Sequence, residues 1–126
     1  MNTLIIEGKI NSPTVNFNCN TGLLKITGRS IPENPVKFYQ PIEDWISSFL
    51  ETKPNKITFY IYLDYLNTHS TECVLILIKK LESYYTTTKT EVKVIWNYDL
   101  DDEDMQLLGT DLATLADVPF EIIEIK

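Results

Sequence analysis

The chain has 126 residues, 44% of them hydrophobic, which is the size of one compact domain with a single core. Its longest apolar run, Val74 to Ile78, is far shorter than the roughly 20 residues of a membrane-spanning helix. Met1-Asn2-Thr3 also lacks the basic and apolar start of a secretion signal. We therefore expect one cytoplasmic domain, residues 1–126, that is not inserted in a membrane.

The charged residues and the cysteines exclude further classes of site. Eighteen acidic and 11 basic residues give a formal charge of -7, and the basic residues are scattered, which argues against nucleic acid as a ligand. Two cysteines, Cys19 and Cys73, and the single histidine, His69, are too few for a zinc site or a disulfide framework. We expect two reduced thiols, no metal and no cofactor.

Short apolar runs near the N-terminus predict an antiparallel sheet. These runs are Leu4–Ile6, Val15–Phe17 and Leu23–Ile26, and turn-forming residues separate them. Asn20-Thr21-Gly22 predicts the hairpin turn between the second run and the third. From Arg29 to Pro35, two prolines then predict an extended loop, because they fix the backbone and remove donors.

Helices and strands alternate in the rest of the chain. A helix is predicted with Pro41 in its first turn, since Ile42, Trp45, Ile46 and Phe49 repeat at helical spacing, and Lys53-Pro54-Asn55 ends it. The elements predicted after it are a strand at Ile57–Leu66, a helix at Ser70–Tyr85, a strand at Val92–Trp96, a helix marked by Met105 to Leu115, and a strand at Phe120–Ile125.

The strand predicted at Ile57–Leu66 is expected to lie at the centre of the sheet. Its alternation places Ile57, Phe59, Ile61, Leu63 and Tyr65 on one face, and Thr58, Tyr60, Tyr62 and Leu66 largely on the other, so we expect cover on both sides. Strands that alternate with helices imply parallel pairs joined by crossovers. The predicted fold is α/β: a mixed sheet of about six strands, with antiparallel hairpins at the N-terminus and helices packed on the sheet.

The segment Asp64 to Glu72 is the strongest candidate for a functional site. It joins the end of the central strand to a helix, which is where α/β sheets place many of their ligands and partners. Asn67, Thr68, Ser70 and Thr71 all suit a helix cap, and the free N–H groups of a first turn also favour an anion. A phosphorylated hydroxyl and a simple cap therefore both fit this pattern.

Two other segments have a structural and a functional interpretation. Asp99 and Asp101 to Asp104 offer carboxylates for magnesium, yet acidic residues also stabilise the first turn of a helix, and no phosphate-binding glycine loop accompanies them. His69 is a possible general base in a small hydrolase that uses the Asp101–Asp104 cluster, although solvated loop histidines are common. The Arg29–Asn34 loop fits a partner contact or a rigid connection equally well.

A long motif then resembles a known family. Gly28-Arg29-Ser30-Ile31-Pro32-Glu33-Asn34-Pro35, followed by Phe38-Tyr39, Pro41-Ile42 and Trp45, is similar to the signature of the SiaC family of bacterial regulatory phosphoproteins. The resemblance continues through Tyr65-Leu66-Asn67-Thr68, Trp96-Asn97-Tyr98, Asp101 to Met105 and Pro119-Phe120, and so covers almost the whole chain.

The resemblance implies a fold like that of anti-sigma factor antagonist (STAS-like) domains and a non-enzymatic role in a partner-switching circuit. In such a circuit a cognate serine/threonine kinase phosphorylates the protein and a PP2C-type phosphatase removes the phosphate. The unmodified form binds and activates a target, which the resemblance implies is a diguanylate cyclase or another protein. Cyclic di-GMP output and biofilm formation then follow the phosphorylation state. The acceptor implied by the motif is Thr68, with Ser70 and Thr71 as alternatives.

The partner surface implied by the resemblance joins two segments. Its residues are Arg29, Ser30, Pro32, Glu33, Asn34, Asn67, Thr68, His69 and Ser70. The family pattern has a small hydroxyl residue where His69 follows Thr68, which implies altered kinase recognition. Two competing hypotheses differ in outcome: a hydrolase turns over a substrate by itself, and a passive scaffold binds a partner with an affinity that ignores phosphorylation.

Overall fold

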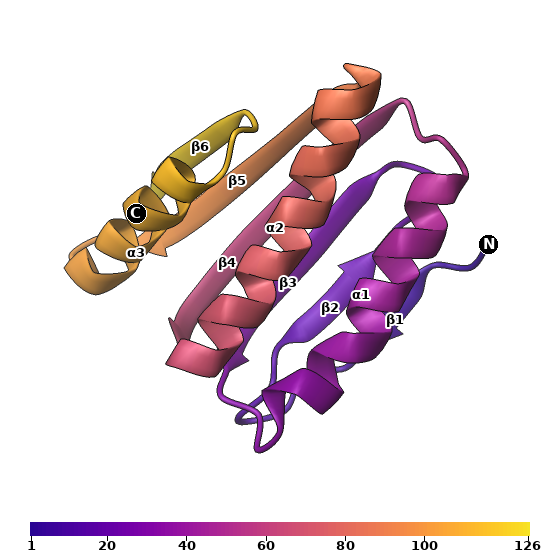
Figure 1. Ribbon diagram of the computed structural model, residues 1–126. Coiled ribbons are helices and arrows are strands. Elements are labelled where there is room, and N and C mark those ends of the chain that lie inside the picture. Colours follow the sequence, from indigo (N-terminus) through magenta and orange to yellow (C-terminus); the bar gives the residue numbers. More distant parts are fainter.

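The computed structural model describes residues 1–126 and contains six strands and three helices (Figure 1). In chain order they are β1 (Leu4–Ile6), β2 (Thr14–Phe17), β3 (Leu23–Ser30), α1 (Pro35–Glu51), β4 (Lys56–Leu66), α2 (Thr68–Thr88), β5 (Glu91–Asp99), α3 (Glu103–Leu115) and β6 (Phe120–Ile125). The predicted α/β class, the number of strands and the N-terminal hairpins are confirmed.

The strands form one mixed sheet in which spatial order follows chain order, β1-β2-β3-β4-β5-β6. β1, β2 and β3 pair antiparallel, whereas β3, β4, β5 and β6 run parallel. α1, α2 and α3 are the connections between the parallel strands. Because parallel strands end at the same edge, the segments that follow β3, β4 and β5 all lie at the carboxyl edge of the sheet.

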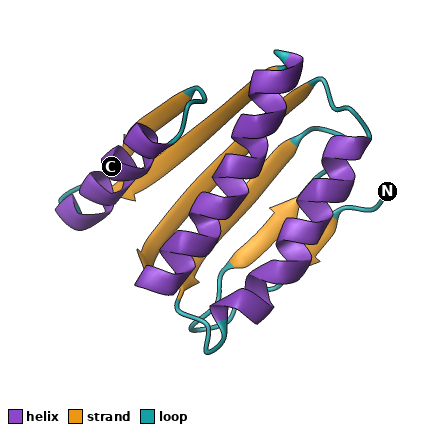
Figure 2. Ribbon diagram, in the orientation of Figure 1, coloured by secondary structure: helices purple, strands orange, loops and turns teal.

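All three helices pack on the same face of the sheet (Figure 2). The core between them and the strands is continuous, and its largest fully buried side chains include Phe17, Phe49, Phe59 and Trp96. None of the three helices combines the length and the apolar composition that crossing a bilayer requires.

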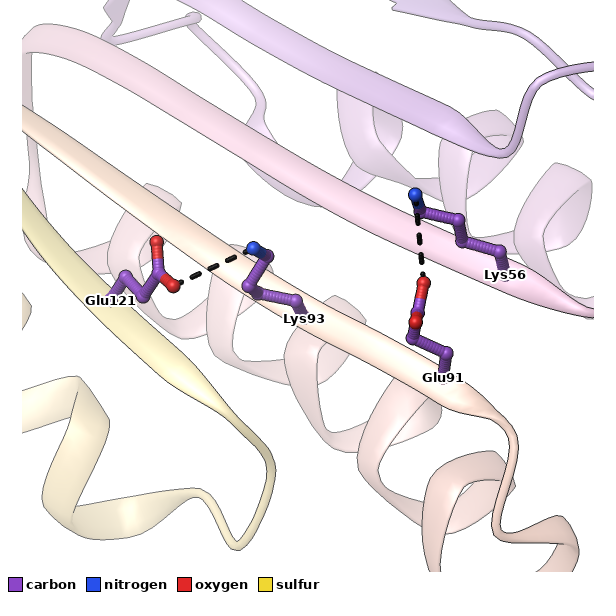
Figure 3. A network of polar contacts seen from close by, with 4 residues as sticks. All are labelled: Lys56, Glu91, Lys93 and Glu121. Atoms are coloured by element: carbon purple, nitrogen blue, oxygen red, sulfur yellow. Dashed lines mark hydrogen bonds and ion pairs between the residues drawn. The ribbon is translucent and has the colours of Figure 1, made fainter.

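The other face of the sheet carries polar side chains, so the expected cover on both sides of β4 is wrong. There Lys56 pairs with Glu91 at 3.6 Å and Lys93 pairs with Glu121 at 3.5 Å, each across neighbouring strands (Figure 3). Thr58, Tyr60 and Tyr62 of β4 are only partly buried on this face. Tyrosine and threonine suit a half-exposed strand as well as a buried one, so the sequence pattern does not distinguish the two.

The beginning of α1 also differs from the prediction. The helix begins at Pro35, with Asn34 as its cap, and not with Pro41 in the first turn. The Asn34 side-chain oxygen accepts a hydrogen bond from the Lys37 backbone N–H at 3.1 Å, and Pro35 occupies a first-turn position where no N–H is needed. Pro41 lies in the helix interior with its ring exposed.

A bulge reverses the orientation of the last residues of β4. Gly28 pairs with Leu63 and Arg29 with Tyr65, so Asp64 is the extra residue. Gly28 has φ 109°, a conformation that favours glycine. As a result Leu66 is buried and Tyr65 is 52% exposed, the opposite of the faces that strict alternation predicts.

Candidate functional site

The site lies at the carboxyl edge of the sheet, where β3 and β4 end side by side. Ser30 pairs with Leu66 in the parallel register, and the Asn67 backbone N–H donates to the Ser30 carbonyl oxygen at 3.3 Å. Each strand is followed by an asparagine that caps the next helix, Asn34 for α1 and Asn67 for α2. The two segments of the predicted partner surface are therefore adjacent.

Asn67 closes the start of α2 through its side chain. Its backbone is extended, with φ -83° and ψ 176°, and its Oδ1 accepts a hydrogen bond from the Ser70 N–H at 2.9 Å. The predicted helix cap is thus confirmed at Asn67, and Thr68 is the first helical residue. This places the Thr68 side chain beside N–H groups of the first turn that have no carbonyl partner in the helix.

The three candidate hydroxyl groups of this turn differ in access. Thr68 is exposed, as is His69 beside it. Thr71 is half-buried, and its hydroxyl donates to the Asn67 carbonyl oxygen at 2.9 Å. Ser70 is 0% exposed, and its Oγ has no hydrogen-bond partner. Of the three, Thr68 is the one that an enzyme reaches without disturbing the turn.

Below this turn, a buried hydroxyl pair connects β3 to α1. Ser30 Oγ and the Tyr39 hydroxyl share a hydrogen bond of 2.6 Å, and both residues are buried. Burial raises the pKa of Tyr39 to about 12, against the lowering effect of the Ser30 hydrogen bond. Burial likewise raises the pKa of the Cys73 thiol, with smaller contributions from Glu72 and Glu43. The buried Tyr39 hydroxyl and Cys73 thiol are therefore both uncharged near neutral pH.

At the rim of the site, Arg29 faces the extra residue of the bulge. Its Nε lies 3.7 Å from Asp64 Oδ1, and both side chains are about half exposed. An ion pair this open to solvent contributes at most about 1 kcal/mol, so Arg29 remains available to a partner. Tyr65 is exposed next to Asp64 and adds an aromatic side chain to the rim.

The predicted partner residues divide into three groups by exposure. Arg29, Glu33, Asn34, Thr68 and His69 are exposed, Pro32 and Asn67 are half-buried, and Ser30 and Ser70 are buried. The serines therefore support the surface from below. Asp64 and Tyr65 belong to the predicted segment Asp64 to Glu72, but the pairing of Asp64 with Arg29, the exposure of Tyr65 and the buried contact of Tyr39 were not predicted. The bulge that exposes Asp64 and Tyr65 has no sequence signal beyond Gly28. Tyr39 stands out in the sequence only as part of the family motif.

The acidic residues at the start of α3 stabilise the first turn of this helix. Asp102 is the cap, and its Oδ1 accepts a hydrogen bond from the Met105 N–H at 3.2 Å, while Glu103 and Asp104 occupy the first turn. Asp99 accepts a hydrogen bond from the Tyr62 hydroxyl, which raises the pKa of Tyr62. No three histidine, cysteine or acidic residues converge as metal ligands do, and His69 lies at the start of a different helix.

Comparison with known proteins identifies the family. The model of the SiaC family of regulatory phosphoproteins matches residues 6–125, nearly the whole chain. The chain belongs to the SiaC family. The family resemblance that the motif from Gly28 to Pro35 indicated is thereby confirmed, and SiaC-family proteins are regulatory phosphoproteins, not enzymes. The hydrolase hypothesis built on His69 and the Asp101–Asp104 cluster is set aside.

Solved structures of SiaC share this fold in full. Apo-SiaC from Pseudomonas aeruginosa superposes with a TM-score of 0.90 at 26% identity, covering 98% of this chain and 99% of that one. SiaC in the crystal structure of the diguanylate cyclase SiaD with its activator SiaC, from the same organism, gives a TM-score of 0.91 at 26% identity, covering 97% and 99%. An uncharacterised protein of Pseudomonas aeruginosa strain UCBPP-PA14 is 27% identical over 97% of this chain and 96% of its own length.

Proposed function

We propose that this chain is a phosphorylation-controlled activator of a diguanylate cyclase. The observation that carries the proposal is the complex in which SiaC, which shares this fold over 97% of the chain at 26% identity, is the activator of the diguanylate cyclase SiaD. In the proposed circuit the unmodified chain binds and activates the cyclase. A cognate serine/threonine kinase releases it by phosphorylation, and a PP2C-type phosphatase restores it, so cyclic di-GMP and biofilm formation follow the phosphorylation state.

Thr68 is the proposed phosphoacceptor. It is exposed in the first turn of α2, whereas Ser70 is buried and the Thr71 hydroxyl is bonded to the Asn67 carbonyl oxygen. A kinase would have to unwind the turn to reach Ser70. Phosphate on Thr68 also gains from the N–H groups and the dipole of the α2 N-terminus, so modification does not melt the helix.

Release follows from charge and desolvation in the interface. A phosphate adds roughly -1.5 to -2 charges at neutral pH, and a partner groove that fits a neutral threonine must then desolvate them. The proposed partner contacts around Thr68 are Arg29, Pro32, Glu33, Asn34, Asn67 and His69, which are exposed or half-buried at this edge. Ser30 and Tyr39, which support these residues, are buried and uncharged. Phosphate on the exposed Thr68 therefore changes the charge of the surface without refolding the chain.

We place this circuit in the cytoplasm. Cys19 and Cys73 are free thiols, as the reducing conditions of the cytoplasm favour, and a kinase that modifies Thr68 finds ATP there. His69 stands beside the acceptor with an exposed side chain, so a cognate kinase has to accommodate an imidazole at that position.

The proposal is tested with the kinase encoded beside the gene. The wild-type chain, Thr68→Ala and the matched control Thr71→Ala are incubated with ATP, and the phosphate is mapped by peptide mass spectrometry. We expect one phosphate on the wild type and on Thr71→Ala, and none on Thr68→Ala. Phosphate on Thr71 or Ser70, or no phosphate from a kinase shown to be active, would remove Thr68 as the control point.

Activation is tested separately from phosphorylation. Diguanylate cyclase from the same organism is assayed for cyclic di-GMP production with and without the unmodified chain. A rise in rate with the unmodified chain supports the activator role. Binding without any change in rate, and with an affinity that ignores phosphorylation, would support the passive scaffold instead.

A further inference from the structure

The outer surface of α3 carries exposed leucines although the helix is well packed on its inner side. Met105, Gly109 and Leu112 are buried against the sheet. Leu107 is 61% exposed and Leu115 is 54% exposed. We use the name α3 ridge for four exposed residues at helical spacing: Asp104, Leu107, Asp111 and Leu115. Neither leucine is part of the core, and both lie on the same exposed side of the helix.

The α3 ridge lies in the most acidic part of the chain. Residues 99–125 contain nine of the 18 acidic residues and no lysine or arginine. Of these nine, only Glu121 forms an ion pair, with Lys93 of β5. Elsewhere the basic residues are interspersed with the acidic ones, whereas every charged residue between 99 and 125 is acidic. This segment therefore has a net negative field, and Glu121 is its only carboxylate that an ion pair offsets.

The negative charge around the α3 ridge disfavours several classes of binding partner. A second copy of the chain would bring the same carboxylates to a symmetric contact, and like charges placed opposite one another repel. Anionic lipid headgroups and nucleic acid phosphates are disfavoured for the same reason. The complementary partner has apolar side chains for the leucines and positive side chains for Asp104 and Asp111.

The spacing selects a helix as the form of that partner. Leu107, Asp111 and Leu115 stand four residues apart, in the row that forms a ridge on a helix and packs into the groove of another. We propose that the α3 ridge is a docking surface for a basic amphipathic helix of a partner protein. The partner's leucine-like residues pack between Leu107 and Leu115, and its lysines or arginines face Asp104 and Asp111.

The position of the α3 ridge relates it to the Thr68 site without making it depend on that site. α3 follows β5 and α2 follows β4, and these parallel strands are neighbours, so both helices begin at the carboxyl edge. α3 lies over the β5 and β6 side of the sheet (Figure 1). The docking surface is a property of the unmodified and the phosphorylated chain alike, and it does not require the target to be a cyclase.

The test uses a synthetic peptide as the probe. It is a labelled helix of about 18 residues, or five turns, with a leucine stripe flanked by lysines, titrated with the full chain by fluorescence anisotropy. One matched peptide keeps the lysines and replaces the leucines by serines, and a second keeps the leucines and replaces the lysines by glutamates. We expect binding of the first peptide alone, with an affinity that falls as salt rises from about 0.05 to 0.5 M.

Variants of the chain test whether the peptide binds at the α3 ridge. Leu107→Ser/Leu115→Ser and Asp104→Lys/Asp111→Lys each weaken binding at least about tenfold. The control Val36→Ser/Ile76→Ser removes two exposed apolar side chains of α1 and α2 and leaves the affinity unchanged. Equal binding of the serine peptide, amide shifts in NMR spectra confined to α1 or α2, or self-association through α3 without peptide binding would each overturn the proposal.

Discussion

The hydrogen bond between Ser30 and Tyr39 shows how a single residue supports the site. The hydroxyls are 2.6 Å apart and buried, and they hold the end of β3 against α1. Tyr39→Phe leaves the Ser30 hydroxyl without a partner, which costs about 1 to 3 kcal/mol of unfolding free energy. Urea denaturation measures this loss. The exposed Tyr65→Phe serves as control and should be neutral.

The same tyrosine predicts a dependence of stability on pH. Because burial raises the pKa of Tyr39 from 10.0 to about 12, the folded chain holds the phenolic proton more tightly than the unfolded chain. This contribution is complete below about pH 10 and is lost as the pH rises towards 12. Denaturation curves across this range should fall more steeply for the wild type than for Tyr39→Phe, and identical slopes would contradict the assignment.

At the scale of residues, the sequence predicts the strand end and the helix cap around Thr68 but not the neighbours of this turn. A strand that ends at Leu66 and a run of cap-forming residues are local signals, and both are visible in the sequence. The exposure of Tyr65 and the pairing of Asp64 with Arg29 come from a bulge between two strands, which depends on their register. Register between parallel strands has no local signature, so these neighbours emerge only from the structure.

At the scale of elements, Gly109 lets α3 lie directly against the Trp96 side chain of β5. A Cβ at Gly109 would lie 2.6 Å from Trp96 Nε1, and this indole N–H donates to the Met105 carbonyl oxygen at 2.9 Å. Gly109→Ala should therefore lower the unfolding free energy by about 1 to 3 kcal/mol, because α3 must shift away from β5. Thr110→Ala, on the exposed side of the same helix, is the control, and a neutral Gly109→Ala would contradict this packing.

The start of α3 distinguishes a cap from a metal site. Asp102→Ala removes the acceptor for the Met105 N–H and should cost about 1 kcal/mol, whereas Asp111→Ala in the middle of the helix should cost little. Magnesium at millimolar concentration should leave the thermal midpoint of wild type and variants unchanged. A midpoint that rises with magnesium in the wild type and not in Asp102→Ala would favour the metal interpretation.

Element boundaries follow from the sequence where turn residues enclose a run, and fail where they do not. β6 begins and ends as predicted, because Pro119 precedes Phe120. β3 continues to Ser30, beyond the predicted end at Ile26, since its last residues pair with β4. α1 begins six residues before Pro41 because the Asn34 cap and Pro35 outweigh the interior proline.

At the scale of the whole molecule, the fold separates three surfaces. The helices cover one face of the sheet, the open face carries lysine–glutamate pairs such as Lys56 with Glu91, and the carboxyl edge carries the exposed Thr68. The alternation of helices and strands predicts the α/β class. It does not predict that every helix lies on one side, because that follows from the consecutive order of the strands.

We propose that phosphate on Thr68 controls the affinity of the whole molecule for its target. Isothermal titration calorimetry of the cyclase with unmodified chain, Thr68-phosphorylated chain and Thr68→Ala tests it directly. We expect at least about a tenfold weaker affinity for the phosphorylated chain, and nearly unchanged affinity for Thr68→Ala, which stays neutral. Equal affinities of the phosphorylated and unmodified chains would contradict it and leave the phosphate without a role in binding.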